Sequence, residues 1–304
     1  MNTVVVKARS NVICWRSYFA LCKPKVVMLI IFTALVGTLL AAPDSPPWLT
    51  ILFATVGIGM AAGAGAAMNH WADRKIDAVM ARTKNRPLPQ AELSPNSVLL
   101  FSLCLAALSM LILVTQTNML TALLTFISMI GYAVIYTMYL KHATPYNIVL
   151  GGAAGATPPL LGWTALTGEV NSEALLLFLI IFIWTPPHFW SLAIKRRKEY
   201  AKAKVPMLPV THGVAFTKLQ ILLYTLMLFV ISILPFVLEM SGIIYLAGAL
   251  SLGIGFIWHA NKLFRNKGDQ HAGKTFGYSI FYLSMLFGFL LADHYARMII
   301  RLWL

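Results

Sequence analysis

The sequence is short of charged residues, and that shortage excludes most soluble folds. Only 11% of its 304 residues are Asp, Glu, Lys or Arg, while 59% are apolar, and the mean hydropathy is +0.76. A soluble domain carries roughly 25% charged residues. A chain of this composition is therefore expected to be an integral membrane protein.

Acidic residues and cysteines are the scarcest of the chemically useful types. There are 10 acidic residues against 24 Lys and Arg, and the three cysteines, Cys14, Cys22 and Cys104, lack metal-type or redox-type spacing. This argues against a disulfide framework or a cysteine metal centre. The excess of cations does not indicate nucleic acid, because no aromatic and basic nucleic-acid motif is present and membrane loops collect Lys and Arg for topological reasons.

Long apolar runs recur along the whole chain and predict one helical bundle. Their lengths are near the ~20 residues that span a hydrocarbon core, so residues 1–304 are read as a single all-α domain of nine transmembrane helices. The expected spans are 26–42, 48–68, 97–114, 118–140, 147–167, 174–194, 218–238, 243–260 and 277–296.

The distribution of cations predicts how this bundle is oriented. If the N-terminus is cytoplasmic, the inside segments hold 22 of the 24 Lys and Arg and the outside loops hold none, so the C-terminus is expected outside. Residues 1–24 are basic and free of acid, which suits an interfacial segment on the anionic cytoplasmic face. The absence of a long Arg- and Ser-rich presequence favours the bacterial inner membrane over the mitochondrial one.

The first of two long cytoplasmic loops, residues 69–96, carries a regular set of oxygen ligands. Asn69, Asp73 and Asp77 are four residues apart, so a continuing helix places them in one stripe. Mg²⁺ typically takes one or two carboxylates and completes its shell with water and phosphate oxygens, so this stripe favours a metal-bridged diphosphate site. A solvated helix end explains the spacing equally well. The cations available for phosphate oxygens are Arg74, Lys75, Arg82, Lys84 and Arg86.

The second loop, residues 195–217, offers a receptor for a polyanion. Glu199 is the single acid among six cations near its start, which is a poor metal cage but a good diphosphate clamp. A topological anchor is the alternative for the Lys and Arg run. The residues expected to bind diphosphate here and elsewhere on the same face are Lys75, Lys141, Lys195, Arg196, Glu199 and Lys202.

Two sets of side chains inside the predicted spans are candidates for a functional role. Tyr132 and Tyr136 form either an interfacial aromatic belt or a π surface that faces a developing carbocation. His188 follows two prolines within a span, where an ionisable group is expensive to bury, and it is predicted to bind a metal or macrocycle iron, with Trp190 beside it. The alternative is that His188 caps carbonyls freed by the prolines.

Four sequence motifs in this chain together resemble those of the UbiA superfamily of intramembrane prenyltransferases and, more narrowly, of its protoheme IX farnesyltransferase (haem O synthase) branch. The resemblance covers residues 23–213, and helices beyond it match in hydropathy alone. The motifs that carry it are Asn69-x-x-x-Asp73-x-x-x-Asp77, Met80-x-Arg82-Thr83-x-x-Arg86-Pro87-Leu88, Pro187-His188-Phe189-Trp190 and Pro206-Met207-Leu208-Pro209.

What the resemblance implies is a nine-helix bundle with a central cavity open to the cytoplasmic face. It implies transfer of a farnesyl group from farnesyl diphosphate to a vinyl group of haem b, giving haem O, with Mg²⁺ held by Asn69, Asp73 and Asp77. Many members carry a second Asp-rich motif where this chain has Glu199 alone among cations.

Two alternatives remain open at this point. A polyprenyltransferase acting on an aromatic quinone precursor would keep the first motif. A secondary transporter would more often place its ionisable groups at the midplane than in two loops on one side. Contact with haem A synthase or a terminal oxidase fits the predicted product, but no residue pattern tests it.

Overall fold

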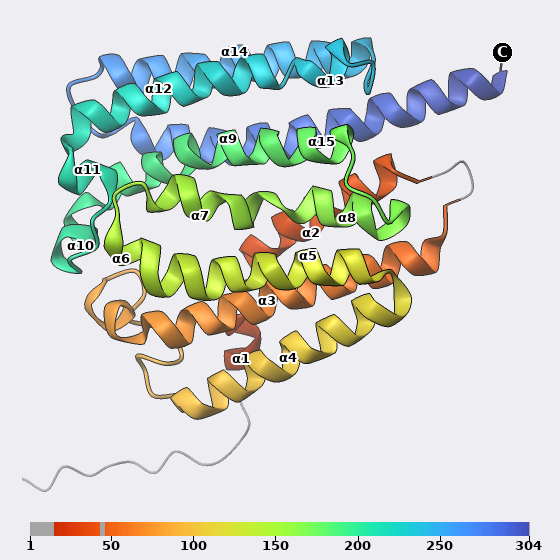
Figure 1. The fold of residues 1–304 in the computed structure, drawn as a ribbon. Coiled ribbons are helices and arrows are strands. Elements are labelled where there is room, and N and C mark those ends of the chain that lie inside the picture. The colour runs from red at the N-terminus through yellow and green to blue at the C-terminus, as the bar shows by residue number, and fades with distance from the viewer. Residues whose placement is uncertain (1–14, 43–45, 304) are drawn as a thin grey trace, which may run out of the picture.

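The computed structural model describes residues 15–42 and 46–303, and every regular element in that part of the chain is a helix (Figure 1). The first fourteen residues of the predicted interfacial segment lie outside the described residues. The elements are α1 Trp15–Leu21, α2 Pro24–Leu40, α3 Trp48–Val79, α4 Pro95–Gln116, α5 Met119–Ile130, the π-helix η1 Gly131–Leu140, α6 Lys141–Ala143, α7 Asn147–Ala156, α8 Pro158–Thr167, α9 Ser172–Lys195, α10 Arg197–Lys202, α11 Leu208–Thr211, α12 Gly213–Ile231, α13 Leu234–Val237, α14 Ile243–Arg265 and α15 Ala272–Trp303.

Seven helical stretches among the described residues are long and apolar enough to cross a membrane, and an eighth is obtained if the bent pair α1 and α2 counts as one span. Each of the nine predicted ranges is largely helical. The range 147–167 differs from the expectation because it is divided into α7 and α8, neither of which is long enough to span alone. The chain is an all-helical integral membrane protein.

The break between α7 and α8 has a covalent cause. Pro158 lacks the N–H that would bond to the carbonyl of Ala154 four residues earlier. The hydroxyls of Ser128 and Thr157 lie 3.0 Å from this carbonyl oxygen and 2.8 Å from each other, and they take the place of the missing donor. The chain can therefore bend inside the bundle without leaving a buried carbonyl unpaired.

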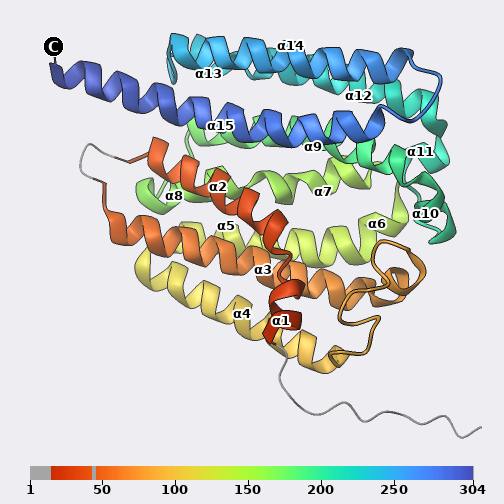
Figure 2. The same ribbon diagram turned by 180° about the vertical axis from the view of Figure 1, so that it is seen from behind.

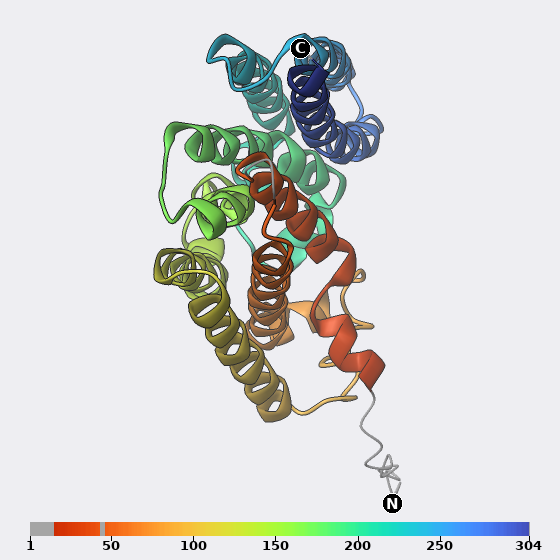
Figure 3. The same ribbon diagram turned by 90° about the vertical axis from the view of Figure 1, so that its right-hand side faces the viewer.

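The helices lie side by side with their connections gathered at two ends (Figure 1, and from behind in Figure 2). The loop after α3, the short helix α6, and α10 with α11 share one end, while α15 terminates at the other (Figure 1). Figure 3 looks along the bundle from the end where α15 terminates. The two loops that were predicted to share one side do lie at the same end of the molecule.

Close approach between backbones holds the middle of the bundle together. A Cβ atom on Gly37 of α2 would lie 2.1 Å from the carbonyl oxygen of Pro159, and one on Gly162 of α8 would lie 2.0 Å from the carbonyl oxygen of Ala34. Only glycine allows α2 and α8 to pack at this distance. The contact keeps α2 over the interior surface that α3, α7, α9 and α15 also line.

The far end of the bundle is tied by a buried carboxylate. Asp293 of α15 accepts hydrogen bonds from the backbone N–H groups at the start of α14, including those of Ile244 and Tyr245 at 3.1 and 3.2 Å. These N–H groups have no partner within their own helix. Asp293 therefore caps α14 from a neighbouring helix and joins the two.

Candidate active site

The predicted stripe of oxygen ligands is buried. Because α3 runs on to Val79, Asn69, Asp73 and Asp77 are all helical, and their exposed fractions are 5%, 4% and 4%. A solvated helix end would leave such side chains in water, so that alternative is wrong. Buried carboxylates must be paired with cations or metal ions.

Asp73 lies at the centre of a hydrogen-bonded group drawn from four segments. Its Oδ2 accepts from Lys141 Nζ at 2.6 Å and from Asn69 Nδ2 at 2.8 Å. Asn69 Nδ2 also lies 3.2 Å from Thr137 Oγ1 of η1, and its Oδ1 accepts from Lys23 Nζ. Asp73 is therefore oriented by two donors on one oxygen, which leaves Oδ1 for another ligand.

Asp77 is held by the loop that follows it. Arg86 donates from a guanidinium nitrogen to Asp77 Oδ2 at 2.7 Å, and Thr83 Oγ1 donates to the Asp77 backbone carbonyl at 2.9 Å. Leu88 packs in an apolar cluster with Leu21 and Val98, which anchors the loop against α1 and α4. The segment from Met80 to Leu88 thus folds back over the end of α3 and places Arg86 against Asp77.

The second loop meets the first around Arg82. Arg196 donates to Glu199 Oε1 at 2.6 Å, and this hydrogen bond lowers the pKa of the Glu199 carboxyl, with a further contribution from the charge of Arg82. Burial raises the pKa of Tyr200, whose charged neighbours include Arg82 and Asp73. Glu199 and Tyr200 of α10 therefore both lie near Arg82 of the first loop.

Three of the predicted diphosphate ligands lie outside this group. Lys75 is exposed and, two residues after Asp73, points away from the stripe. Lys195 and Lys202 are also exposed, and Lys195 lies against α15 near Gly273. The side chains of the other three predicted ligands, Lys141, Arg196 and Glu199, take part in the buried network or lie at its rim.

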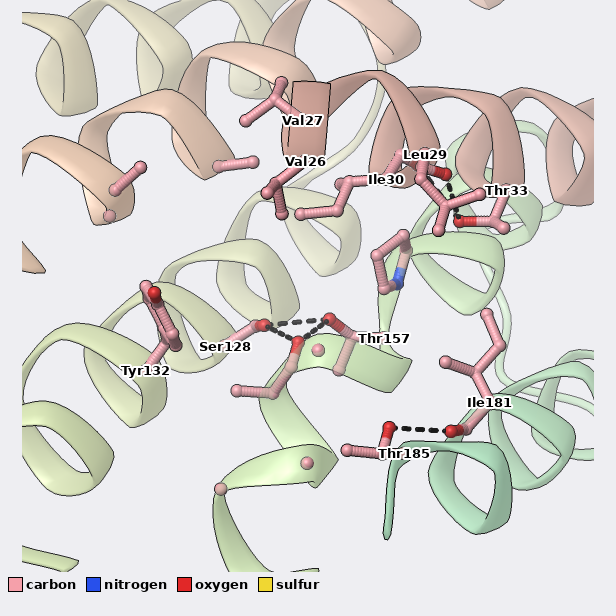
Figure 4. A pocket seen from close by; sticks show the side chains of 18 of the residues that line it. Val26, Val27, Leu29, Ile30, Thr33, Ser128, Tyr132, Thr157, Ile181 and Thr185 are labelled. Atoms are coloured by element: carbon pink, nitrogen blue, oxygen red, sulfur yellow. Dashed lines mark hydrogen bonds between the residues drawn. The ribbon is translucent and has the colours of Figure 1, made fainter. Parts of the chain in front are cut away.

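An apolar cavity of about 400 Å³ opens beneath the polar group. Its walls come from α2, α3, α5, η1, α7, α8, α9 and α15, and Lys23 and Lys25 lie at one end. Figure 4 shows Val26, Ile30 and Thr33 of α2 across from Tyr132, Ser128 and Thr157. A volume of this size is within the range of small-molecule sites.

Tyr132 and Tyr136 line this cavity as a stacked pair. Their ring centroids are 5.7 Å apart with 14° between the planes. Glycines make room for both rings, because a Cβ on Gly65 would lie 3.3 Å from Tyr132 and one on Gly151 would lie 2.2 Å from Tyr136. The pair faces the interior, so an interfacial belt does not describe it.

His188 also lines the cavity, and its surroundings are aromatic. Its ring stacks on Trp184 and Phe276 at centroid distances of 4.2 and 4.6 Å, and its Nδ1 lies 2.7 Å from Ser279 Oγ. No carbonyl freed by the prolines is its partner, so the capping alternative is not observed. Ser279 orients the ring and leaves Nε2 available, which is the arrangement that ligand histidines use.

Trp190 lies on another side of α9. It is buried in an apolar cluster that includes Ile194 and Leu208, with an edge-to-face contact to Tyr224 at 5.3 Å, and it is not among the cavity-lining residues. The geometry therefore brings His188, but not Trp190, to the cavity.

Two members of the site were missed from the sequence. Lys23 had been assigned to the interfacial segment, and its left-handed backbone (φ 50°) before Pro24 turns its side chain toward Asn69. Tyr200 had no signal beyond its position in the second loop. Only the packing of α2 against α3 reveals where the Lys23 ammonium group lies.

Comparison with known proteins places the chain in a family. The UbiA prenyltransferase family matches residues 30–286. The chain belongs to this family. The resemblance predicted from the motifs is thereby confirmed.

Relatives with high identity share one name. A protein of Thioalkalivibrio sulfidiphilus is 60% identical over 291 residues, covering 96% of both chains, and one of Nitrosococcus oceani is 57% identical over 293 residues, covering 96% of this chain and 98% of its own. Both are named protoheme IX farnesyltransferase.

Solved structures agree on the fold at low identity. A digeranylgeranylglyceryl phosphate synthase superposes with a TM-score of 0.77 at 19% identity, covering 92% of this chain and 98% of its own. A UbiA homolog from Archaeoglobus fulgidus, bound to DMAPP and Mg²⁺, has a TM-score of 0.69 at 14% identity, covering 90% and 99%. The bundle is therefore a UbiA fold.

Proposed function

We propose that this protein transfers the farnesyl group of farnesyl diphosphate to a vinyl group of haem b, producing haem O and diphosphate. The observation that carries the proposal is the buried stripe of Asn69, Asp73 and Asp77, which cations surround, and its link through Lys23 to an apolar cavity that His188 also lines. The shared name of the two relatives supports haem as the acceptor.

The residues present suit magnesium. Asp73 and Asp77 each have one oxygen engaged by a cation, so a second oxygen of each carboxylate is free to bind. Within residues 15–42 and 46–303 no three His, Cys, Asp or Glu side chains cluster to hold a metal on their own. The oxygens of the diphosphate would complete the shell, which is how Mg²⁺ usually binds. The bound ion would supply charge neutralisation for the leaving diphosphate.

The chain's own cations perform the rest of that neutralisation. Lys23, Lys141 and Arg86 already point at the stripe, so their charges are in place before the allylic C–O bond breaks. Preorganised charge of this kind stabilises the departing anion without reorganisation. Tyr132 and Tyr136 offer their π faces to the allylic cation on the cavity side.

Bond formation then involves the macrocycle. The vinyl π electrons attack the farnesyl carbon released by diphosphate, one C–C bond forms, and the positive charge moves to the carbon beside the ring. Water adds to that carbon and loses a proton, which accounts for the hydroxyl of haem O. His188, oriented by Ser279 and by aromatic stacking, is our candidate for binding or orienting the haem.

The same proposal includes topology and location. We infer nine crossings, with α2 and the broken α7–α8 segment counted as spans, the N-terminus cytoplasmic and the C-terminus outside. The cation-rich loops at one end of the bundle support this orientation. The location is a bacterial inner membrane, and contact with haem A synthase or a terminal oxidase is compatible with it.

The decisive experiment is product analysis. Purified protein is incubated with farnesyl diphosphate, Mg²⁺ and haem b, and the pigment is extracted and weighed by mass spectrometry. We expect a mass gain equal to one farnesyl group plus one hydroxyl group, because the two add across the vinyl double bond. Unmodified haem, from a preparation that prenylates an aromatic quinone precursor, would overturn the haem assignment in favour of that alternative.

A further inference from the structure

An unpartnered histidine lies inside the polar end of the site. His70, directly after Asn69 on α3, is 3% exposed, and both of its ring nitrogens lack a hydrogen-bond partner among the described residues. A buried polar group without a partner costs free energy, and such groups in folded proteins are rarely left so. The neutral ring carries one N–H, so it requires an acceptor that these residues do not supply.

The position of His70 on α3 defines its surroundings. Residues seven apart on an α-helix lie almost on one line, so Gly63, His70 and Asp77 share one side of α3. A Cβ on Gly63 would lie 3.5 Å from Cys22, next to Lys23, and Asp77 binds Arg86. His70 therefore lies between the start of α2 and the loop that follows α3.

Three cations act on His70. The charges of Lys23, Arg86 and Arg82 all reach its ring, and Lys23 and Arg86 are held nearby by Asn69 and Asp77. A buried N–H donor among converging cations is an environment completed by an anion. Asp73 and Asp77 each give one carboxylate oxygen to Lys141 and Arg86, and neither accepts a hydrogen bond from His70.

We propose that His70 donates a hydrogen bond to an oxygen of the substrate's diphosphate group. The inference rests on the proposed function, since it names a further ligand for the same leaving group. His70 acts as a neutral donor that adds direction to the charges of Lys23 and Arg86. It also anchors the diphosphate on the side of α3 that Asn69 and Asp73 do not cover.

Three substitutions separate hydrogen bonding from shape. His70→Phe and His70→Leu fill the site without a donor, whereas His70→Gln keeps an N–H donor. The probe is inorganic pyrophosphate with Mg²⁺, titrated calorimetrically into the full-length protein in detergent. His294→Phe, next to Tyr295, is the matched control because it removes an imidazole from the C-terminal part of α15, the helix that terminates at the end of the bundle opposite the two loops (Figure 1).

We expect His70→Phe and His70→Leu to weaken pyrophosphate binding by about 10- to 100-fold, the range for a hydrogen bond to a charged group. His70→Gln and His294→Phe should bind within about threefold of the unmodified protein. The melting temperature of the apolar variants should stay the same or rise, because an unpaired buried donor has been removed.

Several outcomes would overturn the proposal. If His70→Phe binds pyrophosphate as tightly as the unmodified protein, His70 is not a diphosphate ligand. The same conclusion follows if His70→Gln binds pyrophosphate as weakly as His70→Phe. A loss of folding in both apolar variants would make His70 a structural residue. If the unmodified protein itself fails to bind pyrophosphate with Mg²⁺, the proposed function fails too, and that result is distinct from the others.

Discussion

Gly151 offers a direct test of how the Tyr132–Tyr136 stack contributes to catalysis. Alanine at this position places its Cβ 2.2 Å from Cδ2 and 2.8 Å from Cγ of Tyr136, whereas ordinary contact begins at 3.4 Å. The clash lies at the base of the ring, so a change at the tip cannot relieve it. The ring must move by about 1 Å, which separates it from Tyr132.

The energetic and kinetic consequences of Gly151→Ala are expected to differ in size. Overpacking costs about 1–3 kcal/mol, while replacing glycine by alanine within a helix gains about 0.5–1 kcal/mol, so the net loss of stability is expected to be below about 2.5 kcal/mol. A displacement of about 1 Å in a group that faces the reacting carbon lowers kcat by about 100-fold. Pyrophosphate binding is expected to be unchanged, because Asp73 and Lys141 are untouched.

The assay compares Gly151→Ala with Gly288→Ala, where an added Cβ meets nothing within 4 Å. Both proteins are measured for thermal unfolding, pyrophosphate affinity and turnover of farnesyl diphosphate with haem b. The control is expected to gain about 0.5–1 kcal/mol and keep its kcat. A folded Gly151→Ala protein with kcat within twofold of the unmodified enzyme would refute the role of the stack.

Three further changes probe other parts of the molecule. Asp73→Ala is expected to lower turnover by at least about 100-fold because Lys141 loses its partner and the proposed magnesium site loses a ligand. Near-normal turnover at low Mg²⁺ would contradict the metal role. His188→Ala is expected to change the absorption spectrum of bound haem while leaving pyrophosphate binding intact, and an unchanged spectrum and haem affinity would remove it from the haem site. Asp293→Ala leaves the N–H groups that begin α14 unpaired, and it is expected to lower the free energy of unfolding by about 3 kcal/mol in denaturant titration. Turnover per folded molecule is expected to be unchanged. A loss of unfolding free energy under about 0.5 kcal/mol would show that water replaces the cap.

The spans and the acidic stripe were predictable because each depends on residues close in sequence. Hydropathy locates a helix from one window, and the spacing of Asn69, Asp73 and Asp77 needs only the turn of one helix. The same helical geometry separates Lys75 from Asp73 and Trp190 from His188, since a two-residue step turns a side chain by about 200°. The predictions for Lys75 and Trp190 assumed that residues close in sequence are also close in space.

Other features depend on segments that meet only in the folded bundle. Lys141 reaches Asp73 across 68 residues of sequence, and Lys23 reaches Asn69 across 46. No local pattern distinguishes these two lysines from the many cations that set topology. The division of the fifth predicted span into α7 and α8 was foreseeable in part from Pro158, but the hydroxyls that make the break tolerable include Ser128 on another helix.

By itself, the sequence determined that this protein spans a membrane, that it is helical, and that an Asp-rich stripe is attached to a cation-rich loop. These properties follow from composition and from contacts within a turn or two of helix. The tertiary structure alone decided which cations face the stripe, that the stripe is buried, and that His188 and the two tyrosines share one cavity. It also decided that His70 has no hydrogen-bond partner among the residues that the structure describes. Side-chain partners are set by which helix faces pack together, and that packing is a property of the whole chain.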